Sequence, residues 1–503
     1  MSGFIYARES GIWRWSFASG DVFFSMVILS AGLVVLATEL TKNVQVYFGF
    51  QQYVFVPKDS RGMSKLAWLI PAVLSVFFIW DLLVPHYDEP LDFGLNAFYA
   101  KDARVVPTSQ NTAIALMGLA APSGRDFIAY GKELTALSKL PTDAADQFIE
   151  ANGELKFKGN LEDIDCWFSI DEVATKACRN PSRLKTIRAE NAELLERYRI
   201  AASLTAYQKD GFGRNGKLFI TINKFIAAEI ISDVSEGKDE VAFQKWRENH
   251  QFLSRLAAAE SSLVEKLILN VAEGVSLVAA ENLLFAAPRV TITHADELQK
   301  LLAAPDIARW SIKGTLRAEF WLLEPILEGA AEGWVHPNYL RNRQYRSAMD
   351  ILTAIRSSPK TLIENLKAIE TKYSSEQWQF VDYVLHTRNV EYGNNIIASG
   401  ARFASIVGAW QAKLGSMRLL ALNALLAHGK VADGEIEQFL RRAGPELQNP
   451  ANGQPAQWNA EYRTIFFCTH EPSRLIQSRL PGGRWFESSE KLCGKALDET
   501  SRQ

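Results

Sequence analysis

The sequence predicts a mostly α-helical protein with two N-terminal transmembrane helices, a large irregular α-helical domain and a small turn or β flap near the C-terminus. Two long apolar runs lie near the N-terminus, apolar residues then recur at intervals of three and four, and turn-forming residues gather after Gly444. The predicted segments are a tail 1–21, a transmembrane helix 22–38, a loop 39–65, a transmembrane helix 66–84, a helical domain 85–444, and a flap and tail 445–503.

The two apolar runs have the length of membrane-spanning helices. Residues 22–38 read VFFSMVILSAGLVVLAT, without a charge, and residues 66–84 read LAWLIPAVLSVFFIWDLLV, with only Asp81. About 20 apolar residues cross a bilayer, and Trp68 and Trp80 lie near the ends of the second run, as interface tryptophans do. Two alternatives remain: a pair of buried core helices or, for the first run, a cleaved signal peptide. We favour retained anchors, because the first run has a weakly charged flank and no convincing cleavage site.

Charges beside these runs indicate which way the chain faces. The loop between the runs carries four basic residues, whereas the segment after the second run begins with three acidic residues. The basic residues are Lys42, Lys58, Arg61 and Lys65, and the acidic residues are Asp88, Glu89 and Asp92. Basic loops stay in the cytoplasm. We therefore expect a bacterial inner-membrane protein whose loop is cytoplasmic and whose large domain is periplasmic.

The overall charge argues against a nucleic-acid partner. The chain has 55 basic and 57 acidic residues, a net charge of −2 and no long basic run. Proteins that bind nucleic acid present a basic patch or stripe to the phosphates. The expected partners are instead the lipid bilayer and another protein of the cell envelope.

The cysteines support an oxidising compartment. All four follow the second apolar run, at Cys166, Cys178, Cys468 and Cys493. An even number confined to the exported part fits two disulfides, whereas a zinc site would need closely spaced pairs, which the sequence lacks. A bridge between the first two would close a loop of about 13 residues and contribute about 3 kcal/mol. Free buried thiols remain the alternative.

From residue 111 onward the chain reads as a stack of amphipathic helices. Such runs occupy residues 218–234, 240–286, 312–327, 343–356 and 360–372. An earlier helix should begin at Pro181, since proline suits the first turn. Its apolar stripe consists of Leu184, Ile187, Leu194, Tyr198 and Leu204. No fixed-period repeat is present, so we expect an irregular stack.

Two further helices and a flap end the chain. The run MRLLALNALLAHG stops at Gly429, and Asp433 is a candidate N-cap for the helix that stops at Gly444. Turn formers then precede a β-like run at residues 462–468. They are Asn449–Pro450, Asn452–Gly453 and Pro455. We expect a hairpin-like flap that caps the last helices.

One segment invites a catalytic interpretation. Residues 258–267 read AAESSLVEKL, which is similar to the glutamate-serine element of lytic transglycosylases, and Glu260 would then be the general acid. The downstream elements of those enzymes are missing, so Glu260 is a weak candidate. The alternative is an exposed glutamate on an amphipathic helix. Histidine spacing predicts no metal site, and no nucleotide-binding or nucleophile-elbow motif occurs, so no cofactor is expected.

Three short signatures together resemble a group of bacterial inner-membrane proteins with a large helical exported domain. The first is matched at Asn111, Leu116, Gly118, Leu119 and Gly131. The second is matched at Pro337, Asn338 and Asn342, and the third at Pro450, Gly453, Pro455, Trp458 and Asn459. The group also often carries a cysteine pair like Cys166 and Cys178. The resemblance implies no activity, and we expect the signature residues to cap helices or tie loops.

This chain departs from the group in two respects. It has two N-terminal runs where one is usual, and residues 391–396 read EYGNNI where an Asn-Pro-x-Gly-Lys element is expected. The first functional hypothesis is a non-enzymatic, membrane-anchored helical protein that binds or scaffolds another envelope component. The alternative is a hydrolase of a cell-envelope polymer, resembling lytic transglycosylases and using a carboxylate as general acid.

Overall fold

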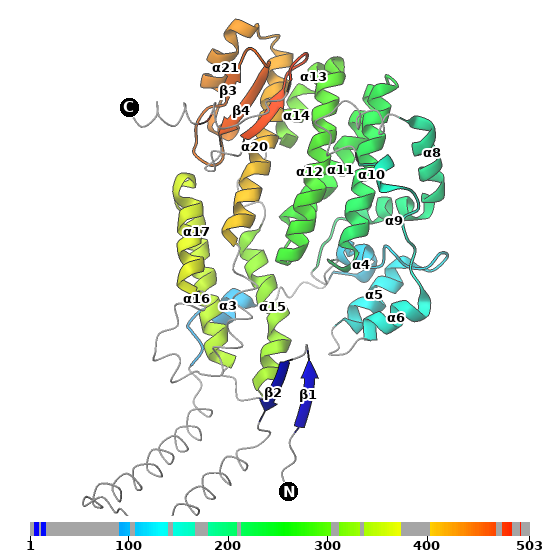
Figure 1. Ribbon diagram of the computed structural model, residues 1–503, viewed down its shortest axis with the longest axis vertical. Helices are drawn as coiled ribbons and strands as arrows, with labels where there is room; N and C mark the ends of the chain where they lie inside the picture. Colours follow the sequence, from blue (N-terminus) through cyan, green and yellow to red (C-terminus); the bar gives the residue numbers. More distant parts are fainter. Residues whose placement is uncertain are drawn as a thin grey trace, which may run out of the picture. The chain divides into compact units, whose positions relative to one another are not determined.

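The computed structural model confirms a mostly helical chain with a small antiparallel sheet near the C-terminus (Figure 1). It describes residues 5–9, 12–16, 90–100, 106–138, 144–165, 180–208, 213–302, 311–331, 337–373, 403–468, 475–484 and 493. Within this described part, no helix is both long and apolar enough to cross a membrane. The two runs predicted to be spans, 22–38 and 66–84, lie outside it.

The chain divides into two compact units. Unit 1 comprises Met1–Leu91, Leu327–Asn342 and Trp378–Asn394. Unit 2 comprises Asp92–Ile326, Arg343–Gln377 and Asn395–Gln503. In unit 1, strand β1 (Ile5–Glu9) pairs antiparallel with β2 (Ile12–Ser16).

Helices make up most of unit 2. The first group is α3 (Leu95–Tyr99), α4 (Thr112–Met117), α5 (Phe127–Leu137), α6 (Ala144–Asn152), α8 (Pro181–Glu190), α9 (Ala192–Ser203), α10 (Gly216–Ser235), α11 (Asp239–Ala258) and α12 (Leu263–Ala286). The second group is α13 (Pro288–Thr293), α14 (Ala295–Leu302), α15 (Ile312–Ala331), α16 (Pro337–Ile355), α17 (Pro359–Tyr373), α20 (Phe403–His428) and α21 (Ile436–Arg442). The end of α15 and the start of α16 belong to unit 1.

Four of the predicted helices are present, although α16 begins at Pro337, ahead of the predicted start at residue 343. The predicted runs 218–234, 312–327, 343–356 and 360–372 correspond to α10, α15, α16 and α17. Pro181 is the first residue of α8, where its missing N–H is not needed.

The prediction of one continuous helix over residues 240–286 was wrong. The chain forms α11 and α12 with a short break between them, because Ser262 begins a new helix. Its Oγ accepts a hydrogen bond from the Glu265 backbone N–H, and the Glu265 carboxylate accepts one from the Ser262 N–H at 2.8 Å. This reciprocal capping box satisfies two N–H groups that have no partner inside the helix.

A second predicted helix is also divided. The stripe that begins after Pro181 runs through α8 and α9, which meet at Asn191. The Asn191 side chain donates to the carbonyl of Ile187 and exchanges hydrogen bonds with the backbone of Lys158. An asparagine that bonds the backbone in this way competes with helix continuation.

Asp433 does not cap the helix that follows it, contrary to the prediction. It begins a 3-10 turn, Asp433–Glu435, ahead of α21 and makes no side-chain cap. Its carboxylate instead pairs with Arg463, which precedes a strand of the C-terminal sheet. Asp433 thus links the turn before α21 to the C-terminal sheet.

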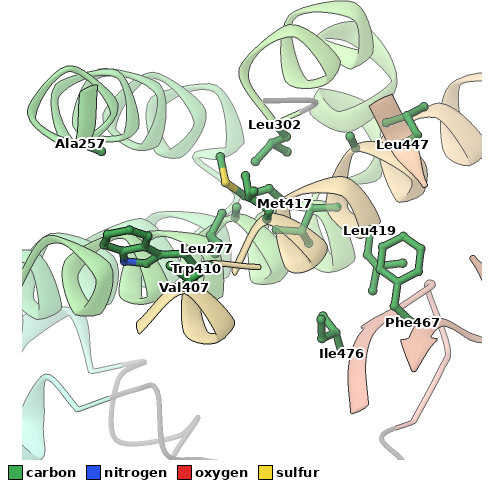
Figure 2. Close-up of a cluster of buried hydrophobic side chains, with 14 of the residues drawn as sticks. Ala257, Leu277, Leu302, Val407, Trp410, Met417, Leu419, Leu447, Phe467 and Ile476 are labelled. Atoms are coloured by element: carbon green, nitrogen blue, oxygen red, sulfur yellow. The ribbon is translucent and has the colours of Figure 1, made fainter. Parts of the chain in front are cut away.

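Helices α12 and α20 form the centre of unit 2. Helix α20 buries side chains all round, so it must be covered on every side. Helices α12, α13, α14 and α17 and strand β5 pack against it, and α10 and α11 pack against α12. Figure 2 shows the shared core, in which Trp410 and Val407 of α20 lie beside Leu277 of α12.

The C-terminal flap is a three-stranded antiparallel sheet rather than a single hairpin. Strands β3 (Gln457–Asn459), β4 (Thr464–Cys468) and β5 (Leu475–Arg479) lie in the order β3-β4-β5. Phe467 pairs with Ile476 across the two longer strands, and both face the core near Leu419 of α20 (Figure 2). The sheet therefore covers α20, as a cap for the helices should.

One of the two expected disulfides is present. Cys468, at the end of β4, is bonded to Cys493, and their Cα atoms are 5.6 Å apart. Cys493 is fully buried. The other two cysteines, Cys166 and Cys178, lie outside the described residues.

Two glycines of the first signature let α4 and α5 cross at very short range. A Cβ on Gly118 would lie 1.7 Å from the carbonyl oxygen of Phe127, and one on Gly131 would lie 2.1 Å from that of Ile114. Real side chains do not tolerate such distances to backbone atoms. The signature glycines therefore serve helix packing.

We predict that Gly131→Ala lowers the free energy of unfolding by about 1–3 kcal/mol, although alanine is the better helix former, because the new methyl group meets backbone that cannot move aside. Urea denaturation of the purified protein measures this. Gly434→Ala is the control, since a Cβ there meets nothing within 4 Å. Equal stability of Gly131→Ala and the wild type would contradict the close crossing.

Candidate functional site

Helix α12 carries charged residues on the side that faces the core, and they form the candidate site. Lys266 and Glu273 are seven residues apart and Glu281 follows eight later, spacings that keep side chains on one side of a helix. Lys266 is 2% exposed and Glu273 3% exposed. Lysine and glutamate are rarely buried to this extent unless they are paired. Their partners therefore decide what these residues do.

At the N-terminal end of α12, Lys266 binds the end of the preceding helix. Its ammonium donates to the carbonyl of Ala257, at the end of α11, and at 2.7 Å to that of Ala259. Carbonyls at a helix C-terminus lack intrahelical partners and favour a cation. Burial lowers the pKa of Lys266 to about 7, and the carboxylates of Glu273 and Glu265 oppose that shift.

The middle of α12 is joined to α20 by a buried ion pair. The Glu273 carboxylate contacts the ammonium of Lys413, and the two side chains are 4% and 6% exposed. Both ions lose their hydration in this position, so their mutual attraction must offset a large desolvation penalty. Such a pair fixes how the two helices lie against each other more than it adds net stability.

The C-terminal end of α12 is joined to the sheet. Glu281 Oε1 accepts a hydrogen bond from the Arg479 backbone N–H at 3.3 Å and lies 3.9 Å from its guanidinium Nε. Burial raises the pKa of Glu281 to about 7, against the opposing charge of Arg479. The guanidinium also stacks 4.9 Å from the ring centre of Phe285, one turn further along α12.

The chemistry open to these groups is limited by their partners. A lysine with a pKa near 7 could act as a general base near neutral pH. The Lys266 ammonium, however, is engaged by two backbone carbonyls. Glu273 and Lys413 neutralise each other, and Glu281 holds a strand. The charges of α12 thus act on neighbouring elements of the fold.

Glu260, the catalytic candidate, lies in the connection between α11 and α12, not on an amphipathic helix as the alternative had it. Its side chain is 38% exposed, and Oε1 lies 2.8 Å from Nη1 of Arg317 on α15. Arg317 donates in turn to the carbonyl of Ala100. The glutamate therefore takes part in a link between three segments, and a nearby guanidinium favours its ionised form, whereas a general acid must hold a proton.

The asparagines of the first two signatures tie backbone segments together. Asn111, 1% exposed, caps α4 by accepting from the Ala113 N–H, and its side chain also exchanges hydrogen bonds with the backbone of Gln208. In unit 1, Asn342 is fully buried and donates to the carbonyl of Pro90 at 2.8 Å. Within α16, which begins at Pro337, Asn338 accepts from Arg341.

The third signature forms the turn that leads into the sheet. The Asn449 side chain accepts from the Ala451 N–H and donates to the carbonyl of Cys468 at 2.8 Å. Gly453 has φ +72°, a conformation that favours glycine. Trp458 lies in β3, opposite Ile465. Pro450 and Pro455 flank the glycine in the same turn, so the signature positions the strand that carries the disulfide.

The charges of α12 were not among the predicted site residues. A signal was present: Lys266, Glu273 and Glu281 interrupt the apolar side of a helix that otherwise contains few charges. Their partners on α20 and β5 are about 140 and 200 residues away in sequence, and no local pattern connects them. Among the described residues, no group of three or more His, Cys, Asp or Glu side chains could hold a metal ion.

Comparison with known proteins gives no family for this chain. No protein-family model matches it, and neither a curated protein nor a solved structure matches it significantly.

We predict that Lys413→Met lowers the free energy of unfolding by about 3–5 kcal/mol, because it leaves the Glu273 carboxylate buried without its partner. The double variant Glu273→Leu/Lys413→Met should recover most of this loss, since it buries no charge. Chemical denaturation of both variants gives the comparison. Additive losses in the double variant would mean that the two charges act independently.

Lys266 should make stability depend on pH. An unfolded lysine has a pKa of about 10.4, so between pH 7 and that value the unfolded chain binds a proton that the folded chain has released. Stability therefore rises with pH in this window, by up to about 3 kcal/mol between pH 7 and 9. Lys266→Met should remove the rise, as followed by denaturation at both pH values. Parallel pH profiles for variant and wild type would contradict this role.

Proposed function

We propose that the protein is a membrane-anchored helical binding or scaffold protein of the bacterial cell envelope, with its large domain in the periplasm and no reaction of its own. The observation that carries the proposal is the disulfide between Cys468 and Cys493. Disulfides persist in oxidising compartments and are rare in the cytosol. Together with two uncharged or nearly uncharged runs of spanning length ahead of the domain, this favours an exported domain on a membrane anchor.

The buried charges contact other parts of the fold, and this favours a binding role over a catalytic one. Lys266 holds helix carbonyls, Glu273 is neutralised by Lys413, and Glu281 binds a strand. A catalytic site would instead direct groups with shifted pKa values toward a substrate. The resemblance of the three signatures to exported helical domains of inner-membrane proteins points the same way. The proposed partners are the bilayer and another envelope protein.

The topology is tested by thiol labelling with a membrane-impermeant maleimide. In spheroplasts with an intact inner membrane, Cys468 and Cys493 should label after prolonged incubation with the membrane-impermeant reductant TCEP, and not without reductant, because they form a disulfide outside the membrane. The control is Ser64→Cys in the loop expected in the cytoplasm. That position should label only after the membrane is broken.

Two outcomes would contradict the proposal. If Cys468 and Cys493 label without reductant, and only in broken membranes, the domain faces the cytosol. If Glu260→Gln abolishes turnover of a cell-envelope polymer while the protein remains folded, the hydrolase alternative is favoured over the binding role.

A further inference from the structure

The segment that begins unit 2 presents a large apolar side chain to solvent. Phe93 is 102% exposed, so its ring makes essentially no contact with the rest of the protein. Moving a phenylalanine side chain from water to an apolar environment is favoured by about tenfold or more, and Phe93 does not make this gain within the chain. An exposed aromatic ring on its own requires no explanation. Its significance depends on whether the segment is held rigidly and on what lies near it.

The residues on both sides of Phe93 are firmly held. The Asp92 carboxylate receives two hydrogen bonds from Arg346 on α16, at 2.7 and 2.8 Å. On the other side, Gly94 has φ +90°, and a Cβ there would lie 3.0 Å from the hydroxyl of Tyr345. The chain is therefore fixed before and after the phenylalanine, and the exposure of Phe93 follows from the fold.

Helix α3 is anchored by aromatic contacts directly after this point. The ring of Tyr99 stacks on Phe320 of α15 with centroids 3.6 Å apart, and Phe98 meets Tyr345 edge to face at 5.6 Å. The indole N–H of Trp321 donates to the carbonyl of Tyr99 at 2.9 Å. These contacts prevent α3 from turning Phe93 inward.

A second exposed apolar side chain lies on the helix that holds Asp92. Met349 is 39% exposed and follows Arg346 by three residues, which places both on one side of α16. The Asp92–Arg346 pair is neutral as a unit. Phe93 and Met349, with this ion pair, are called the juxtamembrane face below.

The length of chain before Phe93 indicates what can cover this face. The second apolar run ends at residue 84, and nine residues span at most about 30 Å. The headgroup layer of a bilayer begins where the apolar run ends. If residues 66–84 cross the membrane, the face is tethered within about 30 Å of lipid headgroups. The tether then keeps the membrane at a high effective concentration near this face. An untethered partner would have no such advantage.

We propose that the juxtamembrane face docks on the headgroup layer of the membrane that holds the second apolar run, with Phe93 inserted among the lipids. Aromatic and aliphatic side chains favour this depth, and a charge-neutral ion pair adds little electrostatic cost there. The proposal rests on the proposed function, because it needs residues 66–84 to span the bilayer. Docking would restrict how the large domain is oriented above the membrane.

The test places the photo-crosslinker p-benzoylphenylalanine at position 93 of the full chain in native membranes. Its control is the same residue at Val241 on α11, which is 49% exposed and far from the tether in sequence. After irradiation, mass spectrometry should find phospholipid adducts about tenfold more abundant at position 93 than at position 241. Carbonate extraction of the same membranes reports separately whether the chain is an integral membrane protein.

The outcomes separate the two proposals. Adducts with protein at position 93, or equal lipid adducts at both positions in a carbonate-resistant chain, overturn the docking while the anchor stands. Release of the chain by carbonate overturns the anchor and the docking together. Unchanged thermal unfolding of the two substituted chains confirms that the probes leave the fold intact.

Discussion

The buried pair between Glu273 and Lys413 joins the two helices against which most of unit 2 packs. It joins α12 to α20, and these two helices receive the rest of the unit: α10 and α11 pack on α12, while α13, α14, α17 and β5 pack on α20. Burial of apolar surface is non-directional, whereas an ion pair requires its two partners to meet. Separating the two charges would leave each of them buried without its partner, so the pair opposes arrangements in which α12 and α20 are displaced along each other.

The other charges of α12 extend this constraint toward both ends. Lys266 binds the end of α11, and Glu281 binds the last residue of β5, so one helix contacts both its predecessor and the edge strand of the sheet. Burial shifts the pKa values of Lys266 and Glu281 toward neutrality from opposite sides. Each ion is therefore held at some cost in stability, and the carbonyls and backbone N–H groups around them offset part of it.

The disulfide and the third signature complete the C-terminal cap. Asn449 holds the carbonyl of Cys468, whose sulfur is bonded to Cys493, so turn, strand and C-terminal segment are joined at one point. The sheet then covers α20, which has no polar side to expose. At the start of unit 2, hydrogen bonds from Arg346 to Asp92 hold the segment from which Phe93 is exposed. A segment held by such contacts would lose little motion in the proposed docking on a membrane.

The sequence by itself determined the helical class, the approximate extent of α10, α15 and α17, the presence of α16, and the strand that ends at Cys468, because hydrophobic periodicity and turn formers act over a few residues. It also contained the capping box at Ser262, although the apolar period running through residues 240–286 concealed it. Only the tertiary structure decided the partners of Glu273, Glu281 and Glu260, and the close crossing at Gly118. The partners of the three glutamates lie 57 to 198 residues away, and the crossing depends on how two whole helices pack, which no local pattern sets.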